Sequence, residues 1–308
     1  MKFTIFQGTR QGPRRYNQDK IAYSYSREAL LAVLADGMGG HQNGDVAAQI
    51  AVKTLTDAFQ RMALPSLVSP AQFLKDSILR AHQAIQNHVI AHNMVDNPRT
   101  TIVAAVAQND TLFIAHVGDS RLYHVRAGKV LFQTEDHSKV QLMFRRGLLH
   151  FGQMGMHPER NKIYNCLGGE IPPKVELQQR TDLADGDTVM LCSDGVWSLV
   201  GDEKMADILS SDTVNTSVTA LLDLAESRAD ARSDNMSAIA FNWGGVVSRA
   251  TVSTALMPLD SVTTIVMNPR QPEEQSAEQA PTEIDLSEDE IEGAIAEIQA
   301  ALKKGPRQ

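Results

Sequence analysis

Four aspartates of this chain stand at the ends of short apolar runs: Asp36, Asp119, Asp194 and Asp234. Short apolar runs closed by turn residues are typical of buried strands, so we expect each carboxylate at a strand tip. Asp36 and Asp194 each begin an Asp-Gly step, and three glycines follow Asp36 within four residues. Glycines permit a tight turn that brings main-chain carbonyls close to a carboxylate. A single step is more often a simple turn, as we expect at Asp185-Gly186, but its recurrence favours a metal site.

The ligand types of this cluster favour hard cations. Carboxylates with no cysteine or histidine at ligand spacing suit Mg²⁺ or Mn²⁺ better than zinc. Without metals, the clustered acids would repel one another, which raises their pKa values. The two cysteines, Cys166 and Cys192, offer neither a disulfide framework nor metal-ligand spacing, so we expect buried thiols.

Composition and charge narrow the classes of function. The 308 residues are 43% hydrophobic, which suffices for a sizeable core, and no apolar run approaches the roughly 18 residues that span a bilayer. The net charge of −8 is concentrated in residues 271–308, which hold ten acids and three bases, whereas the rest holds 27 acids and 26 bases. A nearly neutral body argues against nucleic-acid binding. We expect a soluble, cytosolic protein with no signal peptide and no nucleic-acid or membrane partner.

The order of the predicted elements indicates an α+β fold. We expect strands at 3–7, 21–25, 30–35, 101–108, 111–118, 121–126, 129–133, 188–192 and 236–243, and helices at 43–59, 71–93 and 216–228. The four runs from 101 to 133 are separated by turn residues and predict one antiparallel meander. Residues 135–173 predict a helix followed by a surface insertion. Strands and helices do not alternate regularly, which favours antiparallel sheets, and we predict a β-sandwich flanked by helices.

The composition changes after Gly244-Gly245. Small, polar and acidic residues with several prolines predict a disordered linker over 245–286. Residues 287–304 predict an amphipathic docking helix, because a capping box precedes four apolar residues at helical spacing: Ile291, Ile295, Ile298 and Leu302. This helix needs a partner for its apolar stripe, either the preceding domain or another protein. The predicted divisions are therefore 1–244, 245–286 and 287–304.

Eight short segments of the chain occur in an order known from one protein family. They are Arg14-x-x-Asn17-Gln18-Asp19, Asp36-Gly37-Met38-Gly39-Gly40-His41, Thr100-Thr101, Val117-Gly118-Asp119-Ser120-Arg121, Asp136-His137-Ser138, Leu167-Gly168-Gly169, Ser193-Asp194-Gly195-Val196-Trp197 and Asp234-Asn235-Met236-Ser237. With these segments, residues 1 to about 243 resemble the metal-dependent protein serine/threonine phosphatases of the PP2C type, most of all the bacterial branch. The resemblance implies a β-sandwich flanked by helices, with a flap at about 138–172.

The resemblance implies that six residues ligate metal: Asp19, Asp36, Gly37, Asp119, Asp194 and Asp234. Asp36 would bridge two metals, with the Gly37 carbonyl as a further ligand. Asp194 and Asp234 would hold the first metal, and Asp19 would act nearby or through water. Asp119, together with Asp194, matches the position of a third metal in bacterial members. Two cations that share Asp36 would lower the pKa of a bridging water and supply hydroxide for in-line attack on phosphorus.

Two further residues have candidate roles in catalysis. Arg14 would bind the substrate phosphate, because its planar fork of donors matches two phosphate oxygens. By charge alone, Arg14 is equally well a surface arginine of the basic loop 10–15. A serine or threonine alkoxide is a poor leaving group, so a general acid is expected. His41 is the candidate, and its alternative role is to orient the loop through hydrogen bonds.

We therefore predict a phosphatase that hydrolyses phosphoserine and phosphothreonine in proteins with two, or at most three, Mn²⁺ or Mg²⁺ ions. Its expected partners are the phosphorylated substrates of a bacterial serine/threonine kinase, and we expect a monomeric catalytic domain. Two features, an atypical flap segment over 151–161 and the predicted helix 287–304, favour an alternative: a catalytically weak phosphoprotein-binding scaffold on the same fold. The intact aspartates speak against that alternative.

Overall fold

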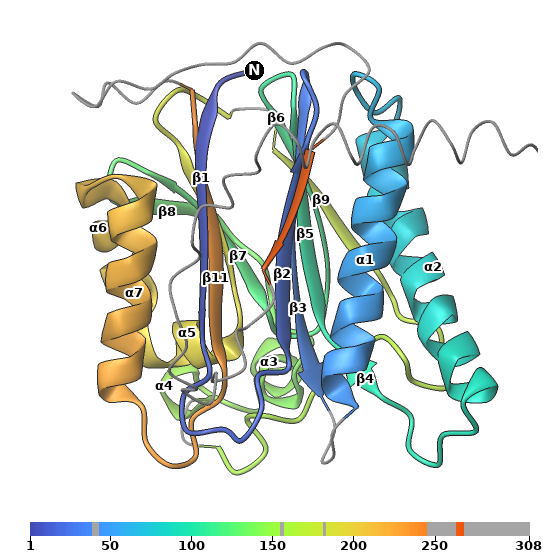
Figure 1. Cartoon of the computed structure of the whole chain (residues 1–308). Coiled ribbons are helices and arrows are strands. Elements are labelled where there is room, and N and C mark those ends of the chain that lie inside the picture. Colours follow the sequence, from blue (N-terminus) through green and yellow to red (C-terminus); the bar gives the residue numbers. More distant parts are fainter. Residues whose placement is uncertain (39–42, 155–156, 181–182, 245–262, 268–308) are drawn as a thin grey trace, which may run out of the picture. The chain divides into compact units, whose positions relative to one another are not determined.

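The computed structural model describes residues 1–38, 43–154, 157–180, 183–244 and, for the backbone alone, 263–267. Its strands form two antiparallel sheets that pack face to face, with helices on the outer faces (Figure 1). The β11 sheet has the order β1 (Phe3–Arg10), β11 (Met236–Trp243), β10 (Thr188–Cys192), β7 (Arg121–Arg126) and β8 (Lys129–Gln133). The β3 sheet has the order β12 (Thr263–Met267), β2 (Asp19–Tyr25), β3 (Ala29–Met38), β5 (Ile102–Gln108), β6 (Thr111–Val117) and β9 (Glu176–Arg180), and β4 (Arg99–Thr100) pairs with the end of β3. The predicted sandwich is confirmed.

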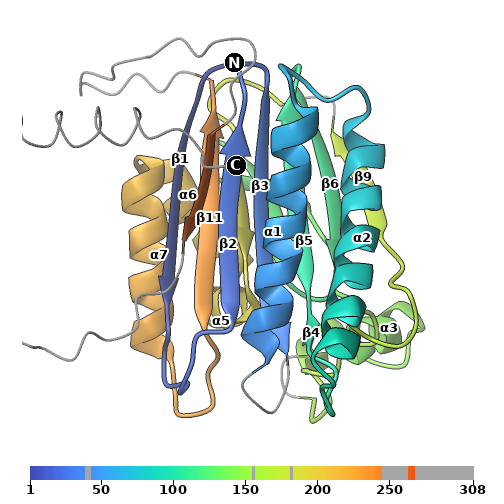
Figure 2. The same cartoon turned by 45° about the vertical axis from the view of Figure 1, so that its right-hand side comes forward.

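Helices cover both outer faces of the sandwich. On the β3 sheet lie α1 (Gly44–Met62) and α2 (Pro70–Ala91), side by side in Figure 2. On the β11 sheet lie α5 (Asp194–Val200), α6 (Asp202–Ser211) and α7 (Val214–Arg228). Two short helices, α3 (Lys139–Arg145) and α4 (Phe151–Met154), follow β8 in the region predicted as a helix with an insertion.

The burial of β3 explains its unbroken apolar sequence. Leu31, Val33 and Ala35 point to α1 and α2 and belong to the core between helices and sheet. Leu30 and Leu34 point the other way, into the core between the two sheets. Because successive side chains of a strand point to opposite faces, a strand covered on both faces is apolar at every position. The strand can therefore deliver Asp36 from the centre of the core to the end of the sandwich.

The predicted meander over 101–133 is wrong in one respect. β5 and β6 belong to the β3 sheet, whereas β7 and β8 belong to the β11 sheet, so the chain changes sheet between Val117 and Arg121. Gly118 permits this turn with φ of +110°, and a Cβ atom there would lie 2.6 Å from Thr101 Cβ. The turn residues at 118–119 thus mark a crossing between sheets and not a hairpin.

Several elements, among them the short strand β4, were not predicted from the sequence. β9 is an edge strand with an exposed, polar sequence and no apolar alternation, and α6 was missed beside α7. β12 lies within 245–286, which was predicted as a linker, and pairs antiparallel with the edge of β2. That part of the segment is a strand, because a free edge of β2 offers unpaired backbone groups to it. The predicted helix 287–304 lies outside the described residues.

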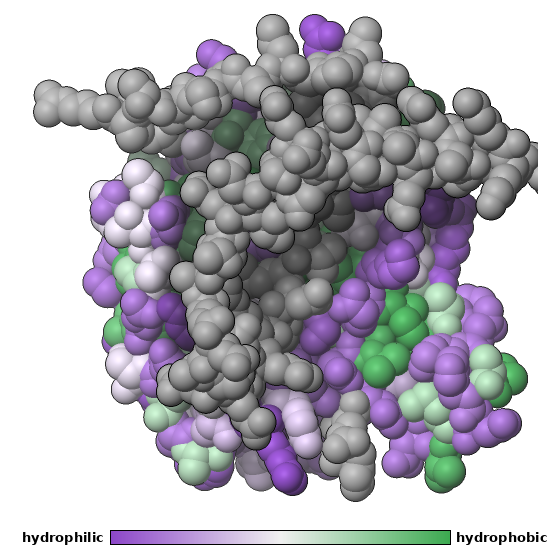
Figure 3. Space-filling model, in the orientation of Figure 1, coloured by the Kyte–Doolittle hydropathy of each residue, from purple (hydrophilic) through white to green (hydrophobic). Residues whose placement is uncertain are grey.

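The described surface seen in Figure 3 is mostly polar over the helices. Ile90, near the end of α2, and Val95, in the segment that follows it, are exposed apolar residues. Within the described ranges, no helix has both the length and the apolar character that crossing a bilayer requires. Both cysteines are free thiols; Cys192 is buried as expected, and Cys166 is half-buried.

Candidate metal centre

Five aspartates gather at one end of the sandwich, where strands of both sheets end. Asp19 begins β2 and lies opposite Asp36 of β3 in the antiparallel register. Asp119 follows β6, Asp194 begins α5 directly after β10, and Asp234 precedes β11. The negative charges of the other four all raise the pKa of Asp36, so the five carboxylates share one electrostatic environment. The structure thus brings together every aspartate that the sequence singled out.

Burial and repulsion between carboxylates raise the pKa values of four of these acids. Burial, with repulsion from Asp234 as a smaller cause, raises the pKa of Asp19 to about 6. Burial and the neighbouring Asp136 raise the pKa of Asp119 to about 7. Burial, followed by repulsion from the other carboxylates, also holds the pKa values of Asp36 and Asp194 well above their usual range. Carboxylates pushed together without compensating cations are typical of a functional site and not of a structural ion pair.

Two of the carboxylate oxygens are suited to ligating a cation. Asp19 Oδ1 and Asp194 Oδ1 are buried and have no hydrogen-bond partner within the described part of the chain. A buried carboxylate oxygen with no donor is costly unless a cation compensates it. An all-oxygen set of this kind suits Mg²⁺ or Mn²⁺. The residues present therefore fit the metals that the sequence predicted.

The backbone around the carboxylates is held by hydroxyl side chains. Thr100 Oγ1 and the Thr101 amide both donate to the Asp36 carbonyl, at 2.8 and 2.9 Å, and the Asp36 amide donates to Thr101 Oγ1. Ser193 Oγ donates to Asp19 Oδ2 at 2.9 Å and accepts from the Ser237 amide at 3.0 Å. Ser193 precedes Asp194, so this hydroxyl links the two sheets at the cluster.

Glycine is required where β3 meets α1. A Cβ atom on Gly37 would lie 2.2 Å from the Gly44 carbonyl oxygen, and one on Gly44 would lie 2.7 Å from Gln18 Nε2. Only hydrogen fits at Gly37, which allows the N-terminal end of α1 to reach the Asp36 backbone. Gly37 is buried and follows Asp36 directly in β3. Its carbonyl, which was predicted to ligate metal, therefore belongs to the same end of the strand as the Asp36 carboxylate.

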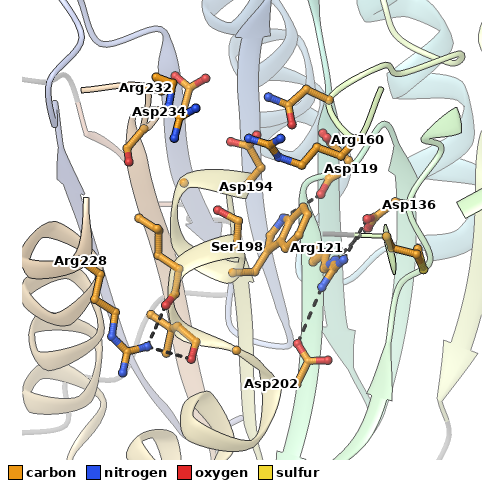
Figure 4. Close-up of a pocket in the computed structure, with 18 of the residues that line it drawn as sticks. Asp119, Arg121, Asp136, Arg160, Asp194, Ser198, Asp202, Arg228, Arg232 and Asp234 are labelled. Atoms are coloured by element: carbon orange, nitrogen blue, oxygen red, sulfur yellow. Dashed lines mark hydrogen bonds and ion pairs between the residues drawn. The ribbon is translucent and has the colours of Figure 1, made fainter. Parts of the chain in front are cut away.

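Arg14 lies at the edge of this cluster. Its Nη2 pairs with Asp234 Oδ2 at 2.8 Å, and its Nε donates to the Ser233 carbonyl at 3.0 Å. Arg14 also lines a pocket of about 1200 Å³, on which Asp119, Asp194 and Asp234 open. In Figure 4, Asp194 lies between Asp234 and Asp119 along that pocket. His41, the candidate acid, lies outside the described residues.

The residues that complete the pocket wall had no role predicted from the sequence. Arg121 forms two hydrogen bonds to Asp136, at 2.8 and 2.9 Å, and its guanidinium lies 3.5 Å from the ring centre of Trp197. Trp197 Nε1 in turn donates to the Asp119 carbonyl at 3.0 Å. These residues belong to the quoted segments, so the motifs contained the signal. Arg160, which also lines the pocket, comes from the insertion and had no sequence signal.

Comparison with known proteins agrees with this arrangement. The family model described as protein phosphatase 2C matches residues 11–232. The chain is 32% identical over 209 residues to the serine/threonine phosphatase stp of Listeria monocytogenes, covering 67% of this chain and 82% of that protein. It is also 32% identical over 214 residues to the serine/threonine protein phosphatase PstP of Mycobacterium tuberculosis, covering 69% of this chain and 40% of that protein.

Solved structures give the same answer for the fold. The serine/threonine phosphatase of S. agalactiae superposes with a TM-score of 0.70 at 28% identity, covering 78% of this chain and 99% of that one. The catalytic domain of PstP in complex with two manganese ions superposes with a TM-score of 0.67 at 27% identity, covering 78% and 97%. The motifs, the sandwich and the aspartate cluster thus agree, and this chain belongs to the protein phosphatase 2C family.

Proposed function

We propose that the aspartate cluster is the active centre with which this PP2C-family enzyme hydrolyses phosphoserine and phosphothreonine in proteins. The chain is a metal-dependent protein serine/threonine phosphatase that uses Mn²⁺ or Mg²⁺. The metal ligands we propose are Asp19, Asp36, Gly37, Asp119, Asp194 and Asp234, with Asp119 and Asp194 assigned to a third ion. One observation supports this assignment above the others: the buried Oδ1 atoms of Asp19 and Asp194 have no hydrogen-bond partner among the described residues.

The residues around the pocket have separable tasks. When bound, the cations supply a hydroxide at neutral pH by lowering the pKa of a water that they share. Asp36, whose pKa is raised by all four other aspartates, would hold both cations. Two of the five N–H groups of Arg14 hold Asp234 and Ser233, so the remaining donors can bind phosphate oxygens at the pocket lining. His41 remains the candidate that protonates the leaving alkoxide.

The alternative, a phosphoprotein-binding scaffold with weak catalysis, is not favoured. A site that had lost turnover would be expected to lose ligands or to satisfy its carboxylates with protein donors. Instead, burial and repulsion keep the pKa values of Asp36 and Asp194 far above their usual range in the absence of cations. Such a cluster costs stability and is explained by metal binding.

The activity identifies the class of substrate but not individual partner proteins. Phosphorylated proteins are the substrates, and we propose that a serine/threonine kinase supplies them. We also propose that 1–244 acts as a monomeric catalytic domain and that the segment 287–304 docks on a protein partner.

The decisive experiment compares two aspartates that stand in identical Asp-Gly steps. Asp36→Asn should lower Mn²⁺-dependent turnover of p-nitrophenyl phosphate and of a phosphothreonine peptide by at least about 100-fold, since removing even an outer-shell partner costs about 10–100-fold. Asp185→Asn changes an exposed turn and should leave turnover unchanged. Calorimetry should show Mn²⁺ binding to the wild type that Asp36→Asn weakens. Full activity of Asp36→Asn, or phosphopeptide binding without metal and without turnover, would overturn the assignment.

A further inference from the structure

A cluster of three polar side chains, His116, His137 and Glu176, lies next to the turn at Gly118-Asp119 and outside the aspartate cluster. His116 of β6 and Glu176 of β9 are opposite one another in the register, and the His137 ring stacks on the His116 ring with centres 4.7 Å apart. The three side chains offer ligand atoms within 4.8 Å of one another. His116 is buried, and its Nδ1 has no hydrogen-bond partner within the described ranges. The cluster is either a further metal site or a hydrogen-bonded support.

The hydrogen bonds of His137 decide between these two roles. His137 Nδ1 faces two donors, the Gly118 amide at 3.1 Å and Asn165 Nδ2 at 2.9 Å. The orientation of the Asn165 amide is fixed, because its Nδ2 donates to the Lys174 carbonyl and its Oδ1 accepts from the Lys174 amide. His137 Nδ1 is therefore an acceptor, and the ring proton is on Nε2, which donates to Glu176 at 3.2 Å.

This tautomer argues against a metal at the cluster. A cation on His137 Nε2 would have to displace the proton there, and Nδ1 could not take that proton while two donors face it. The ring would be left without any proton, whereas metal-ligating histidines keep an N–H on the other nitrogen. The two imidazole rings are also nearly parallel, at 16°, so their in-plane lone pairs do not converge on one point.

What His137 does hold is the turn that carries Asp119. Its ring accepts from the Gly118 amide, and its own amide donates to the Gly118 carbonyl at 2.9 Å. Both peptide units of Gly118 are thus fixed by one residue. Gly118 has positive φ, and a side chain at this position would clash with Thr101, so position 118 has to be glycine. The turn is therefore stabilised by contacts from other residues. Asp119 is the next residue, and its direction depends on this turn.

The same ring also contacts the insertion. Asn165 lies at the end of the segment 138–172, and its two bonds to Lys174 fasten that segment beside β9. Because Gly118 and Asn165 donate to the same nitrogen, a rotation of the His137 ring breaks both bonds together. Glu176 opposes such a rotation by accepting from Nε2.

We propose that His137, held by Glu176, is a positioning residue that directs Asp119 into the metal centre and couples it to the anchor of the insertion at Asn165. This role rests on the proposed metal centre, since it assigns Asp119 a ligand's task. Loss of the ring acceptor should loosen the Gly118 turn before any metal is added. Metal affinity then falls because Asp119 must be ordered during binding.

The test uses two substitutions of His137. In His137→Ala the acceptor is gone, and hydrogen exchange of the metal-free full chain should show faster exchange of the Gly118 amide. Calorimetry should show Mn²⁺ affinity about 10–100-fold lower at the weakest site. His137→Asn places a carboxamide oxygen near the position of Nδ1, so it should restore Gly118 protection and keep the loss of affinity under about tenfold. Phosphatase assays should show a higher Mn²⁺ requirement with little change in the KM for substrate.

A matched control separates positioning from general stability. His124 is a fully buried histidine that bonds Asp187 at 2.8 Å and has no bond to the Gly118 turn. His124→Ala should lower the unfolding midpoint without changing Gly118 exchange or Mn²⁺ affinity. If His137→Ala fails to fold, Glu176→Ala serves instead, because Glu176 lies on an edge strand and its loss should shift both readouts in the same direction.

Several outcomes would overturn the positioning role. These are unchanged Gly118 exchange and Mn²⁺ affinity in His137→Ala, equal losses in His124→Ala, failure of His137→Asn to restore either readout, or a nitrogen NMR spectrum with the proton on Nδ1. Stoichiometric Zn²⁺ binding that His116→Ala abolishes would replace it with the metal site. If Asp36→Asn is inactive while His137 variants behave as wild type, only the positioning role fails. If Asp36→Asn is fully active, the proposed function fails as well.

Discussion

Replacing Asp19 with asparagine should stabilise the metal-free protein above pH 7 while it weakens Mn²⁺ binding. Burial raises the pKa of Asp19 from 3.8 to about 6, and the side chain is 3% exposed. At about 1.4 kcal/mol for each pH unit, the ionised carboxylate destabilises the fold by about 3 kcal/mol. Asparagine keeps an oxygen for Ser193, which donates to Asp19 Oδ2 at 2.9 Å. Its amide group can donate to the neighbouring carboxylate of Asp36.

The sign of the pH dependence follows from the raised pKa. Well below pH 3.8 the carboxyl of Asp19 is protonated in both the folded and the unfolded state and contributes nothing to the pH dependence. As the pH rises from about 4 to about 6, the unfolded chain releases its proton first, so the free energy of unfolding of the wild type falls. The advantage of Asp19→Asn should therefore grow by about 2 kcal/mol between pH 4.5 and pH 8.

Thermal denaturation in the presence of a chelator measures this difference in stability at each pH. At pH 8 the melting temperature of Asp19→Asn should exceed that of the wild type by about 6–12 °C, at about 2–4 °C for each kcal/mol. Mn²⁺ at about 1,000 times its Kd should reverse the order, because it adds about 4.1 kcal/mol to the wild type, which exceeds the advantage of the variant. Asp185→Asn serves as the control. An advantage that is independent of pH, or a destabilised variant at pH 8, would refute the electrostatic reasoning.

Two further predictions concern the backbone and the chain's C-terminal part. Gly37→Ala should lower the free energy of unfolding by about 1–3 kcal/mol and reduce Mn²⁺ affinity, because its Cβ would lie 2.2 Å from the Gly44 carbonyl oxygen. Urea denaturation measures the stability and calorimetry measures the affinity. Wild-type values of both would contradict the close approach of the two backbones. Deleting 270–308 should leave both the turnover of p-nitrophenyl phosphate and the stability unchanged. Deleting 245–308 should lower the stability, because it removes the strand 263–267 that pairs with β2. Equal stability of the two truncated chains would contradict that pairing.

The sequence predicted the sandwich because its strongest signals were local. The apolar run ending at Asp36 is buried on both faces, and the periodicities of α1 and α2 correspond to faces that pack on the β3 sheet. What it could not predict depends on pairing between distant segments. β9 has an exposed, polar sequence and exists because β6 offers it an edge, and β12 pairs with β2 for the same reason.

The residues of the candidate site likewise divide into those that local sequence predicts and those that depend on contacts between distant segments. Asp36, Asp119, Asp194 and Asp234 could be identified from their places at strand ends, whereas Asp19 was indicated only by the family resemblance. Ser193 and Arg121 occur in the quoted segments, but their contacts could not be predicted from them. Ser193 acts through its contact with Asp19, 174 residues away in the chain, and Arg121 through its contacts with Asp136 and Trp197. Such partners are defined by the packing of one sheet on the other and not by local spacing.

The arrangement of the ligands implies that metal binding and sandwich packing are coupled. Asp19 and Asp36 come from the β3 sheet, whereas Asp194 and Asp234 flank strands of the β11 sheet. Without cations, the ionised carboxylates repel one another across the junction of the sheets, and the bond from Ser193 to Asp19 opposes only part of this repulsion. Cations held by both pairs would replace that repulsion with attraction between the sheets. We therefore expect the end of the sandwich that carries the proposed active centre to be the end whose stability depends most on bound metal.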